Sequence, residues 1–191
     1  PKAAKFTHIG TGSAEVKEVA SNRRVLGPDG KVKYTRTSAT KNKEARAAPE
    51  GLIDPNLRTL SFWDGEKPLA ALHFYACHPM SYYGDGRVSA DFCGLARQKR
   101  QDETGVFQAY FNGCGGNITA GKYNDGTKEN RPILRDRIYT AMAAAWALRS
   151  RSRICTIRPS EISSSGCWAT ADGGMRGLSG VCGRGELRTG A

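Results

Sequence analysis

The chain has 191 residues, which is enough for one folded domain with its own core and too few for two domains of ordinary size. Its composition, 39% hydrophobic and 25% charged, is that of a globular protein, so disorder along the whole chain is excluded. The net charge of +11 would suit an anionic partner, but Lys and Arg are spread along the chain with no basic helix face, so we expect no nucleic-acid partner.

The first fifty residues divide into two parts. Residues 6–30 are typical of strand, loop and turn, and they end in Gly-Pro-Asp-Gly at 27–30, where all four positions favour a turn. Residues 31–50 are polar and charged without apolar periodicity, which predicts a long surface excursion. No stretch approaches the ~18 apolar residues that span a bilayer, so we expect no transmembrane segment.

A hairpin of two core strands is expected next. Apolar and aromatic residues fill 57–63 and 69–77, and the turn-forming run Asp-Gly-Glu-Lys-Pro lies between them. The second strand is almost wholly apolar, which predicts burial on both faces. The segment 91–101 then fits a short helix with Leu95 facing inward, and 106–111 fits another apolar strand.

A glycine-rich run at 112–121 should tolerate neither helix nor strand. After it, Asn130 is a good N-cap, Pro132 suits a first helical turn, and apolar residues recur at helical spacing, which together predict a helix over 131–149. The order of these elements indicates an α/β fold with a mixed β-sheet core flanked by helices. We place this domain at residues 1–149.

The composition changes abruptly after Arg149. Lysine disappears, Arg, Gly and Ser dominate, and no apolar periodicity survives to Ala191. Residues 150–191 are therefore expected to form an irregular tail, which is either a disordered linker or an out-of-frame end.

The six cysteines show no C-x-x-C pair and no short Cys/His spacing of a structural zinc site. Disulfides cannot be assigned from their positions. The first three, Cys77, Cys93 and Cys114, are interpreted as small buried thiols.

The most specific candidate site follows the second core strand. In the run Tyr-Ala-Cys-His-Pro-Met-Ser at 75–81, His78 stands where the strand ends and the next proline fixes its backbone, so its imidazole would project into a cleft. A strand-end metal ligand is held in this way, and hydrogen-bonded capping of the strand is the alternative. His73 lies inside the strand and is interpreted as a satisfied core histidine, whereas His8 is a further candidate for the site.

The glycine run is the second candidate. Its glycines would let consecutive backbone N–H groups converge on an anion or a developing oxyanion, while Asn112, Gly116 and Asn117 would contact a substrate. Thr119 carries the only hydroxyl in the run, so Thr119 and Cys114 are its nucleophile candidates. The alternative is a sharp strand-to-loop turn with no binding role.

Arg23 is the third candidate, in the run Asn-Arg-Arg that follows an apparent strand and turn. An arginine near a metal could polarise a carbonyl or neutralise a carboxylate. The alternative is an ordinary surface ion pair.

Four segments, by their order and spacing, resemble the neutral/alkaline ceramidase family, and the likeness spans roughly residues 8–148. The segments are Ala-Ser-Asn-Arg-Arg at 20–24, Ala-Cys-His-Pro-Met-Ser at 76–81, Val-Ser-Ala-Asp-Phe-Cys-Gly at 88–94 and Gly-Asn-Ile-Thr-Ala-Gly at 116–121. The chain looks closest to bacterial ceramidase-like hydrolases. It is similar to an internal fragment, and so an incomplete piece, of their N-terminal catalytic domain.

The resemblance implies a zinc-dependent amidohydrolase that cleaves the amide joining a fatty acid to sphingosine. His78 falls on the family's second zinc histidine, Arg23 on an arginine near the substrate, and Asp91 on the family's Ser-Asp segment. The resemblance thus implies that Arg23 and Asp91 are catalytic residues. Thr119 falls on a serine once assigned as catalytic. The family's Gly-Asp-Val-Ser-Pro-Asn motif reads Gly-Asn-Ile-Thr-Ala-Gly here, so its aspartate, serine, proline and asparagine are all replaced.

The function implied is hydrolysis of ceramide or a related N-acyl lipid with Zn as cofactor, in an extracellular or periplasmic setting with peripheral contact to a membrane surface. The family's other zinc ligands would lie outside this chain, so with His78 alone it should bind zinc poorly and be inactive. Two alternatives stay open: a non-catalytic domain that binds an anionic or sugar ligand, and a hydrolase of another substrate on the same fold.

Overall fold

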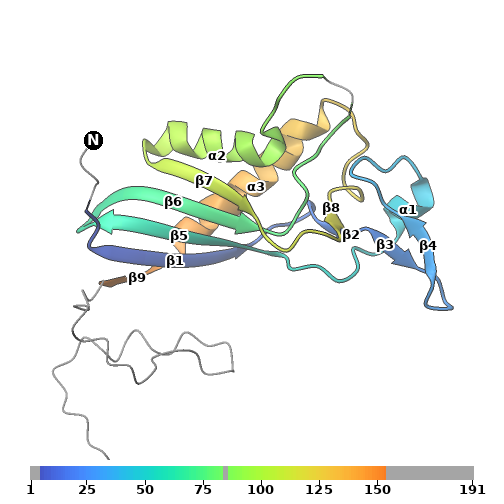
Figure 1. The fold of residues 1–191 in the computed structure, drawn as a ribbon, viewed down its shortest axis with the longest axis horizontal. Coiled ribbons are helices and arrows are strands. Elements are labelled where there is room, and N and C mark those ends of the chain that lie inside the picture. Colours follow the sequence, from blue (N-terminus) through green and yellow to red (C-terminus); the bar gives the residue numbers. More distant parts are fainter. Residues whose placement is uncertain (1–4, 84–85, 154–191) are drawn as a thin grey trace, which may run out of the picture.

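A computed structural model describes residues 5–83 and 86–153, which fold around one five-stranded sheet. The sheet has the strand order β7-β6-β5-β1-β9 (Figure 1). Its strands are β1 (His8–Glu15), β5 (Asn56–Asp64), β6 (Lys67–Tyr75), β7 (Phe107–Asn112) and β9 (Ser150–Arg153). Strands β6 and β7 run parallel, and the other neighbours are antiparallel. The expected α/β class with a mixed sheet is therefore confirmed.

The predicted hairpin is β5 and β6, which pair in register with Leu60 opposite Leu72. The chain then passes through α2 (Asp91–Thr104) before it returns as β7 beside β6. A helical crossover of this kind is what a parallel pair of strands requires. The C-terminal ends of β6 and β7 consequently lie at the same end of the sheet. His78 follows β6 there, and the glycine run follows β7.

Both long helices, α2 and α3 (Asn130–Ala147), pack on one face of the sheet (Figure 1). Alternate residues of β5 are buried toward them, beginning with Leu57 and Thr59. On the other face, Phe74 is 36% exposed and stacks on Phe111 with ring centroids 5.2 Å apart. Burial of β6 on both faces was therefore a wrong prediction, because the described helices cover only one side.

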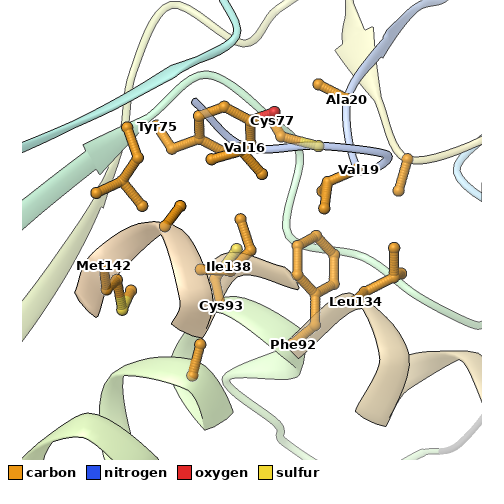
Figure 2. Close-up of a cluster of buried hydrophobic side chains, with 14 of the residues drawn as sticks. Val16, Val19, Ala20, Tyr75, Cys77, Phe92, Cys93, Leu134, Ile138 and Met142 are labelled. Carbon is orange, nitrogen blue, oxygen red and sulfur yellow. The ribbon is translucent and has the colours of Figure 1, made fainter. Parts of the chain in front are cut away.

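The core lies between the sheet end and these helices (Figure 2). Tyr75 of β6 and Phe92 of α2 are each at most 1% exposed, and Leu134, Ile138 and Met142 of α3 are fully buried. Burying a side chain of this size contributes about 1.5–3 kcal/mol relative to leaving it exposed. The apolar periodicity that predicted α3 thus marks the residues that hold this helix in place.

The predicted orientation of α2 was wrong in one respect. Leu95 is 40% exposed, whereas Phe92, Cys93 and Ala96 face the core. Successive residues turn about 100° around a helix axis, so a helix that directs Ala96 inward carries Leu95 to its flank.

Helix α3 begins one residue before its predicted start. Its N-cap is Glu129, and no side chain caps the helix there, so Asn130 as N-cap was a wrong prediction. The side-chain amide of Asn130 instead donates to Asp125 Oδ1 over 2.5 Å. At its other end α3 approaches the β1 backbone so closely that a Cβ on Gly12 would lie 1.9 Å from the carbonyl oxygen of Ala145.

Residues 31–50 are more regular than their composition indicates. They contain β4 (Val32–Thr35), which pairs with β3 (Arg24–Leu26), and the short helix α1 (Lys43–Ala47). Arg36 is only 1% exposed, and its guanidinium donates to the carbonyl oxygens of residues 22, 45, 48, 49 and 50. A buried polar side chain organises this segment, so a search for apolar periodicity could not detect it.

His73 is a core histidine, as predicted. It is fully buried, with Nδ1 2.8 Å from Thr59 Oγ1 and Nε2 2.8 Å from Gln108 Oε1. Burial disfavours the charged imidazolium and lowers the pKa of His73 to about 4.

This shift predicts a specific pH dependence of stability. Above pH ~6.5 His73 is neutral in both the folded and the unfolded chain; as the pH falls toward 4, only the unfolded chain takes up the proton. The free energy of unfolding should therefore fall by up to about 3 kcal/mol over this window. Urea unfolding between pH 7 and 4.5 measures the change, and a His73→Gln variant should show a flatter profile. An equal slope in both proteins would contradict the assignment.

Strand β9 extends the sheet to Arg153, beyond the expected domain boundary at 149. The rest of the expected tail, residues 154–191, lies outside the described residues. Among the helices in the described part of the chain, none is long and apolar enough to cross a membrane.

Candidate metal and substrate site

The glycine run closes against the end of the sheet and then forms a short strand. This strand, β8 (Ile118–Thr119), pairs with β2 (Ser21–Asn22) in antiparallel register. The expectation that no strand could form in the run was therefore wrong, because the pairing uses its two residues with branched side chains. After β8, the backbone at Gly121 lies very close to the backbone of Thr37. Only glycine allows this approach, since a Cβ on residue 121 would lie 1.9 Å from the carbonyl oxygen of Thr37.

His78 lies beneath this loop with its ring fixed from one side. Its Nδ1 is 2.8 Å from the carbonyl oxygen of Gly115 and 3.0 Å from that of Ile118. Both partners can only accept, so in the neutral ring the proton is on Nδ1 and Nε2 keeps its lone pair. Within residues 5–83 and 86–153, nothing hydrogen-bonds to Nε2.

This arrangement is the one that metal-ligating histidines use. Such residues donate one ring N–H to a backbone carbonyl or a carboxylate and bind the metal through the other nitrogen. The two interpretations of His78 are thus compatible, because capping accounts for Nδ1 and leaves Nε2 available. His78 fits a zinc ligand in its tautomer and half-buried position.

The loop after His78 is held by a buried polar network around Ser81. The backbone N–H of Ser81 donates to Asp91 Oδ2 over 3.0 Å, its hydroxyl accepts from Arg131 Nε over 2.8 Å, and its carbonyl accepts from the amide of Asn124. Arg131 Nη2 also pairs with Asp91 Oδ2 at 3.2 Å. These contacts join the loop to the first turns of α2 and α3.

Asp91, which the sequence placed among the catalytic residues, has a supporting position here. It is 7% exposed, and its Oδ1 accepts from the N–H of Phe92 over 2.7 Å while Oδ2 is shared by Ser81 and Arg131. With both oxygens engaged in hydrogen bonds, Asp91 fixes the loop that follows His78, and its catalytic role stays a prediction.

Thr119 and two of the cysteines in the described part of the chain are buried. Thr119 is 1% exposed, and its hydroxyl donates to Ser38 Oγ over 3.2 Å. Burial raises the pKa of Cys77 to about 12, so its thiol stays protonated at neutral pH. Cys93 is buried as predicted, but Cys114 is exposed, which corrects its interpretation as a buried thiol.

Three of the predicted site residues meet in one cleft of about 480 Å³. It is lined by Arg23, Arg24, Val32, Thr35, Gly116 and Asn117. The backbone N–H of Arg23 donates to the carbonyl of Asn117 over 2.9 Å, and the Asn117 amide donates to Asn22 Oδ1 over 2.6 Å. Asn112, at the end of β7, does not line this cleft. Sequence reasoning did not single out Arg24, although it stands beside Arg23.

A second cleft, of about 440 Å³, lies along the same glycine loop and is largely apolar. Its lining includes Leu52, Ile53, Phe74, Tyr75, Cys114 and Ile118. The loop therefore lines both a basic cleft and a mainly apolar one that also includes the Asp54–Arg58 ion pair. The two carbonyls that hold His78 belong to this loop.

His8 belongs to the opposite end of the sheet. It pairs with Trp63 beside the β5–β6 turn, whereas His78 follows β6 at the other end (Figure 1). A strand of eight residues spans roughly 24 Å, so His8 and His78 cannot share a metal. In the described part of the chain, no group of three or more His, Cys, Asp or Glu residues could hold a metal ion.

One solved structure, described as "Ceramidase complexed with C2", is similar to this chain with a TM-score of 0.55 at 20% sequence identity. The match covers 74% of this chain and 22% of that structure, so this chain spans about a fifth of the length of the ceramidase. No protein-family model and no curated protein matches the sequence. At this identity the likeness shows a shared fold, and the domain described here has the fold of part of a ceramidase.

Proposed function

We propose that this chain is part of a zinc-dependent amidohydrolase of the neutral/alkaline ceramidase family, of the bacterial type, which cleaves the amide bond of ceramide or a related N-acyl lipid. The observation that carries the proposal is the fixed tautomer of His78, whose Nε2 is free at the sheet edge of a fold shared with a ceramidase. Further zinc ligands would come from chain outside the described residues, since His78 is the one that fits here.

Zinc bound at this site would polarise the amide carbonyl and lower the pKa of the attacking water. The residues of this chain would orient the groups around the metal. The carbonyls of Gly115 and Ile118 keep the proton on Nδ1 of His78, so that Nε2 presents its lone pair. Asp91 fixes the following loop through Ser81 and thereby limits the movement of the imidazole.

The two clefts beside the glycine loop suit the two ends of an N-acyl lipid. The apolar cleft with Leu52 and Phe74 offers a surface for an acyl chain, and Arg23 and Asn117 offer donors for polar groups. Peripheral contact with a membrane surface, in an extracellular or periplasmic location, would give such an enzyme access to its lipid. Thr119 would act by packing, because its hydroxyl is buried against Ser38.

The test compares the protein of natural gene length with the 191-residue chain in metal content and in hydrolysis of N-acyl sphingosine. We expect stoichiometric zinc and turnover in the long protein alone. Tight zinc without cleavage of N-acyl sphingosine would instead indicate another acyl substrate on the same fold. Absence of zinc from the long protein would reject the hydrolase and leave a binding domain.

A further inference from the structure

The side chains of Arg23 and Arg24, unlike those of most arginines of this domain, have no partner among the described residues. Arg36 is saturated by backbone carbonyls, and Arg131 pairs with Asp91. In contrast, the guanidinium groups of Arg23 and Arg24 make no hydrogen bond, ion pair or ring contact with any residue in the described ranges. Both line the same cleft, and no carboxylate lines it with them.

Two consecutive residues of the glycine loop also line this cleft. Gly116 and Asn117 line it, and neither of their N–H groups donates to a residue in the described part of the chain. A Cβ added to Gly116 would meet no atom within 4 Å, so the space in front of the glycine is open. Consecutive backbone N–H groups that lack internal partners are a recurrent feature of anion sites.

We propose that this cleft is a binding site for a phosphomonoester or free phosphate, held by the guanidinium groups of Arg23 and Arg24 and by the N–H groups of Gly116 and Asn117. One guanidinium fork satisfies the two oxygens of a carboxylate. Two guanidinium groups and two N–H groups supply more donors than the two oxygens of a carboxylate can accept. They match the three terminal oxygens of a phosphate monoester. Two positive charges also balance the charge of about −1.5 to −2 that a monoester carries at pH 7.

The backbone around the two arginines is fixed before any ligand binds. The N–H of Arg23 donates to Asn117, and the N–H of Arg24 donates to Asn22 Oδ1 over 3.0 Å. The Asn22 side chain in turn accepts from the Asn117 amide, so Asn22 links the segment that carries the two arginines to the glycine loop. Little backbone ordering would remain for binding, which favours affinity. The site uses no zinc, but it shares its cleft and Arg23 with the polar-group contacts proposed for the hydrolase.

The first test measures binding of inorganic phosphate to the 191-residue chain by isothermal titration calorimetry at constant ionic strength. We expect saturable binding, and a loss of at least about tenfold in affinity in each of Arg23→Gln and Arg24→Gln, the size expected for one charge-assisted bond. Arg58→Gln is the matched control, because Arg58 is exposed and pairs with Asp54 away from this cleft. Urea unfolding without phosphate should be unchanged in the Arg23 and Arg24 variants, since neither side chain has an internal partner.

A second arm separates the two sources of phosphate. Binding to phosphatidylcholine vesicles that contain phosphatidic acid, lost in the Arg23→Gln/Arg24→Gln double variant, would support a lipid headgroup. Phosphate binding without vesicle binding would support a soluble phosphomonoester. The proposal is overturned if acetate binds as tightly as phosphate, if chloride at equal ionic strength abolishes the signal, or if the double variant binds as the parent does. None of these readouts requires zinc or amide hydrolysis, so failure of this proposal can be distinguished from failure of the proposed function.

Discussion

Replacement of His78 by asparagine in the full-length protein is expected to abolish zinc retention and N-acyl sphingosine hydrolysis while the fold survives. The side-chain amide nitrogen of asparagine can occupy the position of Nδ1 and donate to the carbonyls of Gly115 and Ile118. Asparagine has no atom in the position of Nε2, so the metal loses a ligand. Changes to the outer partners of metal ligands already cost 10–100-fold in affinity, so we expect a loss of more than about 100-fold here.

Metal analysis after dialysis, kcat/KM and urea unfolding together distinguish this result from misfolding. His8→Asn serves as the matched control, because His8 lies at the other end of the sheet and should leave zinc and turnover unchanged. Stoichiometric zinc in a folded His78→Asn protein would remove His78 from the metal site. In the 191-residue chain the same variant should alter neither the midpoint nor the slope of unfolding by much, since the two carbonyls keep a donor.

Arg36→Met is expected to cause a large loss of stability, about 3–5 kcal/mol. Arg36 is 1% exposed, and its three guanidinium nitrogens donate to five carbonyl oxygens over 2.6–3.4 Å. Methionine fills a similar volume but donates nothing, so these oxygens would remain buried without partners at a cost of about 1–3 kcal/mol for each one that water cannot reach. The segment after α1 would then lose its attachment to β2.

The measurement is the midpoint of urea unfolding, with Arg58→Met as control. The Arg58 side chain is 58% exposed in an ion pair with Asp54, so its removal should cost less than about 1 kcal/mol. Arg36→Lys should fall between the two, because a single ammonium group with three donors cannot reach all five oxygens. An effect below 1 kcal/mol for Arg36→Met would show that water satisfies these carbonyls once the arginine is gone.

The parts of the fold that the sequence predicted are those built on apolar periodicity. The β5–β6 hairpin and α3 were recognised because the alternating or helical spacing of apolar residues determines which face is buried. The segment around Arg36 was missed because its order arises from hydrogen bonds to carbonyls several residues away. Asn130 was mistaken for a cap because an amide can be satisfied equally well by Asp125 in the preceding turn.

Some of the positions around the candidate site were predictable from the sequence, while its metal and substrate roles stay predictions. A histidine at a strand end followed by proline was enough to single out His78, and a glycine run was enough to single out Gly116 and Asn117 as neighbours of a cleft. The burial of Thr119 was not predictable, because it depends on Ser38 from a distant part of the chain. In the same way, the supporting position of Asp91 depends on Arg131, which lies 40 positions away.

The pairing of β1 with β9 affects how the nascent chain can fold. Thr11 and Ser150 lie opposite each other in the sheet, and they are 139 positions apart in sequence. Contacts of such high separation slow folding, because the entropy of closing the loop is lost before the contact forms. During synthesis the outer edge of β1 would therefore remain unpaired until nearly the whole domain has left the ribosome, and over that interval it presents an open strand to other chains or to a chaperone.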